Sequence, residues 1–250
     1  MRRGSRRATG SPPIGPFTPS LFPDLVPSPP EDEATLLARA DALAGRSLEG
    51  VAQQLGLRVP RDLKRHKGWV GQLAEHALGA EASSLDEPDF RRLGIELKTL
   101  PVDRWGRPVE STFVATVPLH QVGDTPWASS RVRRKLARVL WLPVQGERAQ
   151  PLASRRFGHA LLWTLEGELE TALRQDWEDL SGMMGRGEIE GITGRHGRFL
   201  QVRPKAANAR VRTRSTDAEG VMMETAPRGF YLRPRFTGGI LARHFALPRR

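Results

Sequence analysis

The apolar residues of this 250-residue chain change their spacing several times, and this alternation limits the folds that the chain can adopt. Apolar residues three and four apart, which are typical of amphipathic helices, occur within residues 36–43, 48–55, 65–80, 165–184 and 238–247. Runs of β-branched and aromatic residues, which are typical of strands, occur within residues 93–100, 111–119, 138–144, 197–204 and 229–232. This mixture predicts an α/β or α+β domain in which helices flank a mixed β-sheet.

The first 33 residues differ in composition from the rest of the chain. They are rich in Pro, Ser, Gly and Arg, and they hold too few apolar side chains to bury much surface. We therefore expect a disordered or extended tail over residues 1–33 and one folded domain over residues 34–250. No apolar run approaches the roughly 18 residues that cross a bilayer, and the basic N-terminus lacks the apolar segment of a secretory signal.

The charge of the chain indicates a polyanionic partner. Its 39 Lys and Arg residues exceed its 28 Asp and Glu residues, which gives a net charge of +11. Nucleic acid is the partner that such an excess favours, and a general bias toward basic, soluble proteins is the alternative. The chain has no cysteine, which excludes disulfides, zinc–thiolate sites and thiol nucleophiles and fits a reducing cytoplasm.

The segment DFRRLGIELK carries two carboxylates and a lysine in a pattern that suits a strand. Asp89 and Glu96 are separated by six residues, and Lys98 follows Glu96 after one apolar residue. In a strand, Glu96 and Lys98 share one face and lie about 6 to 7 Å apart. Asp89 precedes the strand and can fold back toward it from a turn.

Two carboxylates that converge in this way suit a hard divalent cation, most naturally Mg²⁺. Such a cation binds a scissile phosphate oxygen and lowers the pKa of the attacking water, while Lys98 positions that water and stabilises the developing charge. Glu75, on the predicted helix fourteen residues before Asp89, offers a third carboxylate. The pattern predicts metal-dependent phosphodiester hydrolysis, and a solvated strand face with a Glu96–Lys98 ion pair is the alternative.

Five longer blocks of sequence add to this short pattern. They are LKRHKGWVGQLAEHALGA, DFRRLGIELKTLPVDRWGRPVESTFV, RRKLARVLWLPVQGER, FLQVRPKAANA and PRGFYLRPRFTGGILARHF. In this order, and over nearly the whole chain after residue 36, they resemble the MutH family of DNA mismatch-repair endonucleases. The resemblance implies a type II restriction-endonuclease-like fold, in which two subdomains around a mixed β-sheet form a DNA cleft.

The family resemblance also implies an activity and its residues. The activity is Mg²⁺-dependent nicking of the unmethylated strand at hemimethylated GATC sites, just 5′ of the G. The implied catalytic residues are Asp89, Glu96, Lys98, Glu75 and Lys135, and the implied metal ligands are Asp89, Glu96 and Glu75. Lys135 would lie near the scissile phosphate and Lys67 would contact another phosphate. General surface charge is the alternative for both of these lysines.

Residues 195–214 hold seven Lys or Arg residues and no Asp or Glu. Their low aromatic content favours duplex DNA over stacked single strands. Arg203 and Lys205 are the candidate base contacts, because Arg pairs bidentately with guanine O6 and N7. The resemblance implies that the loop VRPKAANAR, residues 202–210, recognises GATC, and a basic loop without sequence preference is the alternative.

Tyr231, the single tyrosine, matches the position that the family links with the adenine whose methylation is sensed. A core tyrosine is the alternative. Nearby, Pro234 and the long segment RTRSTDAEGVMMETAP depart from the family pattern.

The resemblance further implies partners: the ATPase MutL, which stimulates nicking, and indirectly MutS. The terminal segment GGILARHFAL is either a MutL-docking helix or, as we prefer, part of the core. The length favours a monomer. Two other functions compete with the repair function, namely a stand-alone restriction-type endonuclease that cuts both strands and a DNA-binding module without catalysis.

Overall fold

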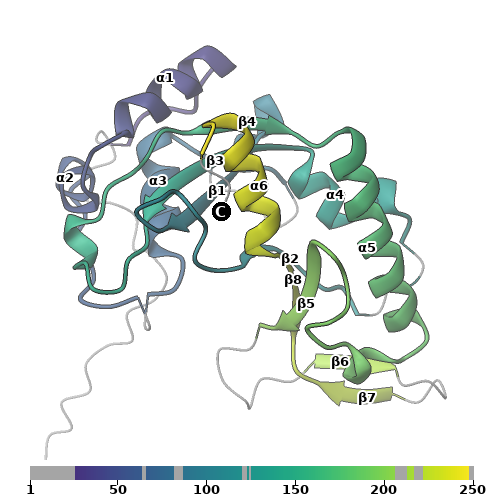
Figure 1. Cartoon of the computed structure of the whole chain (residues 1–250). Helices are drawn as coiled ribbons and strands as arrows, with labels where there is room; N and C mark the ends of the chain where they lie inside the picture. The colour runs from purple at the N-terminus through teal and green to yellow at the C-terminus, as the bar shows by residue number, and fades with distance from the viewer. Residues whose placement is uncertain are drawn as a thin grey trace, which may run out of the picture.

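The computed structural model describes residues 26–63, 66–81, 87–119, 123, 125–205, 213–216 and 222–247. Its α-helices are α1 (Glu33–Leu43), α2 (Leu48–Gln54), α3 (Trp69–Leu78), α4 (Arg131–Leu136), α5 (Gly167–Gly185) and α6 (Pro234–His244). Its strands are β1 (Glu96–Val102), β2 (Thr112–Thr116), β3 (Arg138–Gln145), β4 (Leu161–Thr164), β5 (Leu200–Pro204), β6 (Thr213–Thr216), β7 (Met222–Thr225) and β8 (Arg228–Leu232). Figure 1 shows α1, α2 and α3 on one side of β1 and β3, with α4 and α5 on the other.

The first sheet has the strand order β1–β3–β4. Strands β1 and β3 are parallel, whereas β3 and β4 are antiparallel, so the sheet is mixed as the sequence predicts. Leu140 and Leu142 of β3 pack in the core beneath α1, α2 and α3, while Val139 and Trp141 pack in the core on the other face. Burial on both faces explains why this strand is continuously apolar in sequence.

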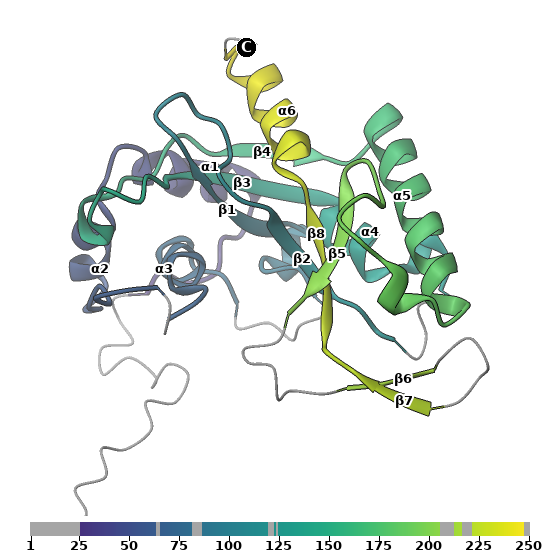
Figure 2. The same ribbon diagram turned by 60° about the horizontal axis from the view of Figure 1, so that its bottom comes forward.

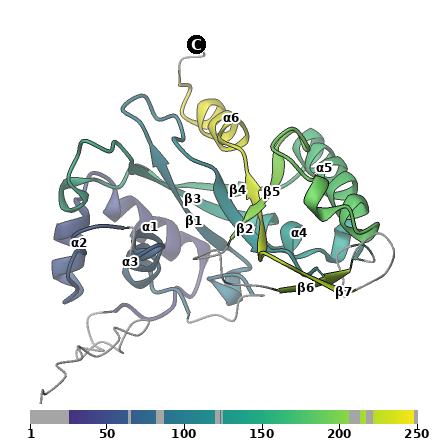
Figure 3. The same ribbon diagram turned by 90° about the horizontal axis from the view of Figure 1, so that it is seen from below.

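The second sheet, with the order β2–β8–β5, is antiparallel. One of its faces is apolar and packs against α4, α5 and α6 through residues such as Val202 and Phe230. The opposite face carries Phe113, Arg203 and Tyr231. The hairpin of β6 and β7 extends beyond this sheet (Figure 2). Seen from below, α3 and α5 lie on opposite sides of the strands (Figure 3).

Helix ends follow local chemistry. The side chain of Asp32 accepts a hydrogen bond from the Thr35 N–H at 2.7 Å and so caps α1. The predicted helix over residues 65–80 is shorter in the structure, because α3 begins only at Trp69. The preceding Gly68 has φ of +86°, a left-handed conformation that cannot continue a helix. Helix α6 begins at Pro234, four residues before the predicted segment, because proline suits the first helical turn.

Four elements lack a signal that the sequence analysis recognised. They are α4, β4 and the hairpin of β6 and β7. Helix α4 has six residues and β4 has four, which is too short for a period to be evident. Of the predicted tail, residues 1–25 lie outside the described residues, and Glu33 is already the first residue of α1. None of the described helices is long and apolar enough to cross a membrane.

Candidate active site

Asp89 reaches β1 through a tight turn. Phe90 and Ile95 pair with each other through two backbone hydrogen bonds, at 2.9 and 3.3 Å. Gly94 closes the turn with φ of +64°, which a glycine adopts without strain. The Leu97 N–H then donates to Oδ2 of Asp89 at 2.8 Å. The predicted return of Asp89 to the strand is therefore present.

Glu96 lies buried between two lysines. Its side chain is only 3% exposed; Lys98 Nζ donates to Oε1 at 2.5 Å and Lys135 Nζ to Oε2 at 2.8 Å. Lys135 comes from α4 and also donates to the Glu87 carbonyl at 2.5 Å. A buried carboxylate is costly unless it is paired, and here both oxygens are. The Glu96–Lys98 ion pair of the alternative interpretation is present, but it is buried rather than solvated, because Lys98 is 15% and Glu96 3% exposed.

Glu75 and Asp89 are carboxyl groups with raised pKa values. Burial, assisted by the negative charge of Asp89, raises the pKa of Glu75 to about 7, against the opposing charge of Lys98. Burial also raises the pKa of Asp89, with Glu96 adding to the effect while Lys98 and the Leu97 N–H oppose it. Partly buried carboxylates that repel one another bind a proton or a cation readily.

The donor chemistry at this place fits a hard divalent cation. The oxygens of Glu75, Asp89 and Glu96 are ligands that Mg²⁺ prefers, and a cation would relieve the repulsion that raises the pKa values of Glu75 and Asp89. Within the described ranges, no three His, Asp or Glu side chains form a ready-made metal cage. The Glu96 oxygens face lysines instead, so a metal that takes Glu96 as a ligand must share it with them.

A cleft of about 640 Å³ joins this cluster to the second sheet. Lys67, Glu75 and Lys98 line it from the side of α3 and β1. Arg203 and Tyr231 line it from β5 and β8, so five residues that the sequence analysis selected share one cavity. Figure 2 shows α3 and β5 on either side of β1 and β2.

The cleft wall on the second sheet combines aromatic rings with basic groups. The Phe113 and Tyr231 rings meet edge to face, with centroids 5.4 Å apart. The guanidinium carbon of Arg203 lies 5.6 Å from the Tyr231 centroid, and Lys205 Nζ lies 4.0 Å from that of Phe113. Lys205 also donates to Thr116 Oγ1 at 2.8 Å. Tyr231 is half-buried at the cleft rather than enclosed in the core.

The sequence analysis did not predict Phe113 as a site residue, although the strand segment STFVATV that contains it was recognised. Because side chains alternate along a strand, Phe113 points to the face opposite that of the buried Val114, and so away from the core. The predicted recognition loop continues into residues 206–210, which lie outside the described residues.

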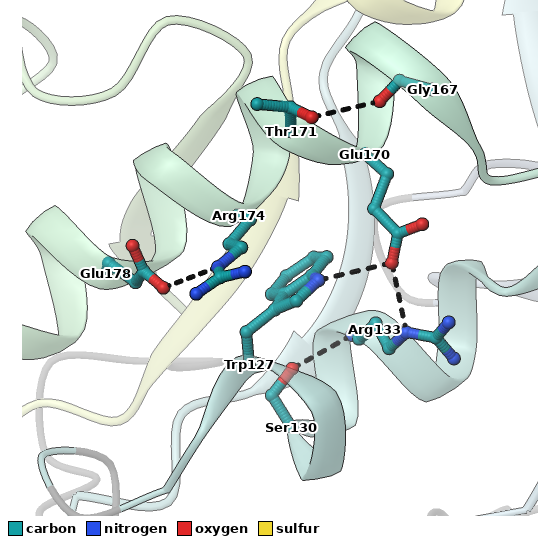
Figure 4. A network of polar contacts seen from close by, with 8 residues as sticks. All are labelled: Trp127, Ser130, Arg133, Gly167, Glu170, Thr171, Arg174 and Glu178. Atoms are coloured by element: carbon teal, nitrogen blue, oxygen red, sulfur yellow. Dashed lines mark hydrogen bonds and ion pairs between the residues drawn. The ribbon is translucent and has the colours of Figure 1, made fainter.

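A polar network fixes α4, the helix that carries Lys135 (Figure 4). Glu170 of α5 accepts hydrogen bonds from Trp127 Nε1 at 3.3 Å and Arg133 Nε at 3.1 Å. Ser130 caps α4 by accepting from the Arg133 N–H at 3.1 Å. The Glu170 side chain is only 28% exposed because it turns toward α4.

The comparisons with known proteins agree with one another. Residues 78–176 match the family model described as DNA mismatch repair enzyme MutH. The chain is 54% identical over 220 residues to the DNA mismatch repair protein MutH of Serratia proteamaculans, which covers 88% of this chain and 96% of that protein. The identity and both coverages are the same for MutH of Escherichia coli O6:K15:H31. An alignment this long at this identity shows common descent, and the chain belongs to the MutH family of DNA mismatch-repair enzymes.

Proposed function

We propose that this mismatch-repair endonuclease nicks the unmethylated strand of duplex DNA at hemimethylated GATC sites in a reaction that requires Mg²⁺. The return of Asp89 to β1, beside the buried Glu96 and its two lysines, is the observation that carries the proposal. Metal-dependent hydrolysis of a phosphodiester needs acidic metal ligands and a positively charged group close together beside the substrate.

Each residue of the cluster has a proposed part in this reaction. Asp89, Glu96 and Glu75 would hold Mg²⁺, which when bound activates water and neutralises charge on the phosphate. Lys98, which lines the cleft, orients the water and stabilises the developing negative charge. Lys135, 7% exposed, holds Glu96 from the side of α4 and keeps a positive charge near the scissile phosphate.

The opposite wall of the cleft would bind and read the duplex. Lys67 contacts a backbone phosphate, as suits an exposed lysine at the mouth of the cleft. Arg203 and Lys205 contact base edges in the major groove. Tyr231 packs against the adenine of the strand to be cut, where a methyl group on N6 would clash with the ring.

The proposal extends to the cellular setting of the enzyme. We infer a monomer in the cytoplasm that is stimulated by MutL and, through MutL, depends on MutS. We also infer that residues 1–30 are dispensable for metal-dependent nicking, because their Pro-, Ser-, Gly- and Arg-rich composition cannot build a packed surface.

A nicking assay tests the proposed function. Circular duplexes with one GATC site are prepared in unmethylated, hemimethylated and fully methylated form and are incubated with the enzyme and Mg²⁺, with and without MutL. We expect single-strand nicks in unmethylated strands only, with stimulation by MutL. Partner-independent double-strand breaks would instead indicate a restriction-type enzyme, and binding without any cutting would indicate a DNA-binding module.

A further inference from the structure

A second cavity, rich in arginine, adjoins the cleft. Its volume is about 440 Å³, and its lining includes Ser111, Arg195, Gln201, Arg233 and Arg235 but, among the described residues, no Asp or Glu. Ser111 also lines the cleft, and it accepts a hydrogen bond from Gln201 Nε2 at 2.7 Å. The two cavities therefore share the lining residue Ser111. We call this second cavity the arginine pocket.

Strand pairing places the arginine pocket and the cleft on one face of the second sheet. Tyr231 pairs with Gln201, and paired side chains share a face, as does every second side chain along a strand. Arg203 lies two residues from Gln201, and Arg233 lies two residues from Tyr231. The polar face of the sheet thus runs from Arg203, through Gln201 and Tyr231, to Arg233.

The wall of the arginine pocket is a fixed loop. Asp176 of α5 accepts hydrogen bonds from the backbone N–H groups of Arg198, Phe199 and Leu200 at 2.6, 2.5 and 2.8 Å. These three bonds engage both oxygens of this buried carboxylate. The loop that carries Arg195 is thereby held in place before any ligand arrives.

No acidic residue within the described ranges neutralises the positive charge in the arginine pocket. No ion pair to Arg195, Arg233 or Arg235 occurs among the residues that the structure describes. Arg233 Nη2 donates to the carbonyls of Gly194 and His196, and its Nε is buried without a hydrogen-bond partner. Arg195 and Arg235 are exposed. Concentrated, unneutralised guanidinium groups attract an oxyanion such as phosphate.

We propose that the arginine pocket binds a backbone phosphate of the duplex outside the recognised sequence. The proposal rests on the proposed function, which places duplex DNA in the cleft. Arg203 pairs with Gly229, and Arg233 follows Gly229 by four residues, just past the end of β8; in extended backbone this is a distance of roughly 14 Å. This length equals the rise of about four base pairs of duplex DNA. The contact therefore lengthens the footprint on one side of the site and carries no sequence information.

Duplex length provides the test. Binding to the wild type and to the double variant Arg195→Ala/Arg235→Ala is measured by fluorescence anisotropy without Mg²⁺, at several salt concentrations. One duplex has about two base pairs on either side of GATC and the other has about ten. Arg174→Ala is the matched control, because Arg174 is an exposed arginine on α5 that pairs with Glu178 (Figure 4).

We expect the double variant to bind the long duplex about tenfold more weakly, with a log–log salt slope that is less steep by roughly one to two. Its affinity for the short duplex and its nicking rate at saturating DNA should match the wild type. An unchanged slope on the long duplex, or an equal loss on the short one, would overturn the proposal.

The variant Arg195→Lys/Arg235→Lys should recover most of the affinity, and failure to do so in a folded protein would count against a phosphate contact. If the wild type bound DNA but never nicked it, the proposed function would be refuted. The binding comparison between the wild type and the double variant on long and short duplexes would still test the arginine pocket.

Discussion

Two parts of the cleft are held together in different ways. The carboxylate cluster, defined as Glu75, Asp89, Glu96, Lys98 and Lys135, is partly or fully buried and is joined by ion pairs and hydrogen bonds between α4, β1 and the turn before β1. The reading face, defined as Phe113, Arg203, Lys205 and Tyr231, is more exposed and is joined by aromatic and cation–π contacts within one sheet. Substitutions in the first should therefore damage chemistry or folding, and substitutions in the second should damage binding alone.

The largest expected effect separates chemistry from binding. Asp89→Asn removes a proposed metal ligand but keeps the size of the side chain, so nicking should fall by about a thousandfold or more, since a bound metal contributes several kcal/mol to transition-state stabilisation. DNA affinity should stay within about threefold of the wild type. Single-turnover nicking and anisotropy measure the two quantities, and Asp179→Asn on the exposed face of α5 is the control. Near-normal nicking by Asp89→Asn would remove Asp89 from the site.

The next effect is on folding. Glu96→Ala leaves Lys98 and Lys135 without their shared carboxylate, and breaking a buried ion pair costs about 3–5 kcal/mol of unfolding free energy. Arg203→Ala, on the exposed reading face, should change the same quantity by less than about 0.5 kcal/mol. Chemical denaturation of both variants gives the comparison. Equal losses in the two variants would show that the parts are not held differently.

A third substitution sharpens the role of the reading face. Arg203→Ala should reduce the preference for GATC duplex over random duplex by about 10-fold to 100-fold, because one bidentate base contact contributes about 1–3 kcal/mol of discrimination. Competition binding with the two duplexes measures the preference. A loss that is the same for both duplexes would mean that Arg203 contacts only phosphate.

The pH dependence of metal binding tests the cluster by a different route. The pKa of Glu75 is raised to about 7, so Mg²⁺ must displace a proton below that pH. The apparent Mg²⁺ affinity should rise by up to about tenfold per pH unit below pH 7 and then level off. Nicking as a function of Mg²⁺ concentration, from pH 5.5 to 8, measures this apparent affinity. In the Glu75→Gln variant, the rise of Mg²⁺ affinity with pH below pH 7 should be less steep.

The same group affects stability in the metal-free protein. Because the folded pKa of about 7 lies above the ordinary value of 4.5, the folded state binds this proton more tightly than the unfolded chain does. The contribution of Glu75 to the free energy of unfolding is therefore greatest below pH 4.5 and is lost as the pH rises through 7. A Glu75→Gln variant that keeps the full pH dependence of stability between these values would contradict the assignment.

The smallest expected effect concerns the support of the cluster. Glu170→Gln weakens the partly exposed pair with Arg133 that fixes α4, so the loss should be at most about 1 kcal/mol, or roughly 2–4 °C in Tm. Nicking should fall slightly because α4 carries Lys135. Calorimetry and kcat measure the two effects. Glu178→Gln, which breaks the outward pair with Arg174, is the control and should leave kcat unchanged.

Local sequence was sufficient for much of the fold and of the site. The alternation of Ile95, Glu96, Leu97 and Lys98 predicts which side chains face the core and which face the cleft, because the period of a strand is fixed by its backbone geometry. The buried strand of residues 138–144 and the long helix of residues 165–184 were evident for the same reason. Asp89 was expected to fold back, and the chain does so through Gly94.

Contacts between distant segments were decided only by the tertiary structure. Lys135 meets Glu96 from 39 residues away, and Arg133 meets Glu170 from 37 residues away, and no local period encodes either pairing. The burial that raises the pKa of Glu75 depends on how α3 packs beside β1, and the arginine pocket exists because Arg195 and Arg233, distant in sequence, line one cavity. The sequence determined the chemistry available on each segment through its backbone period, whereas the packing of those segments decided which charges meet and how far water is excluded from them.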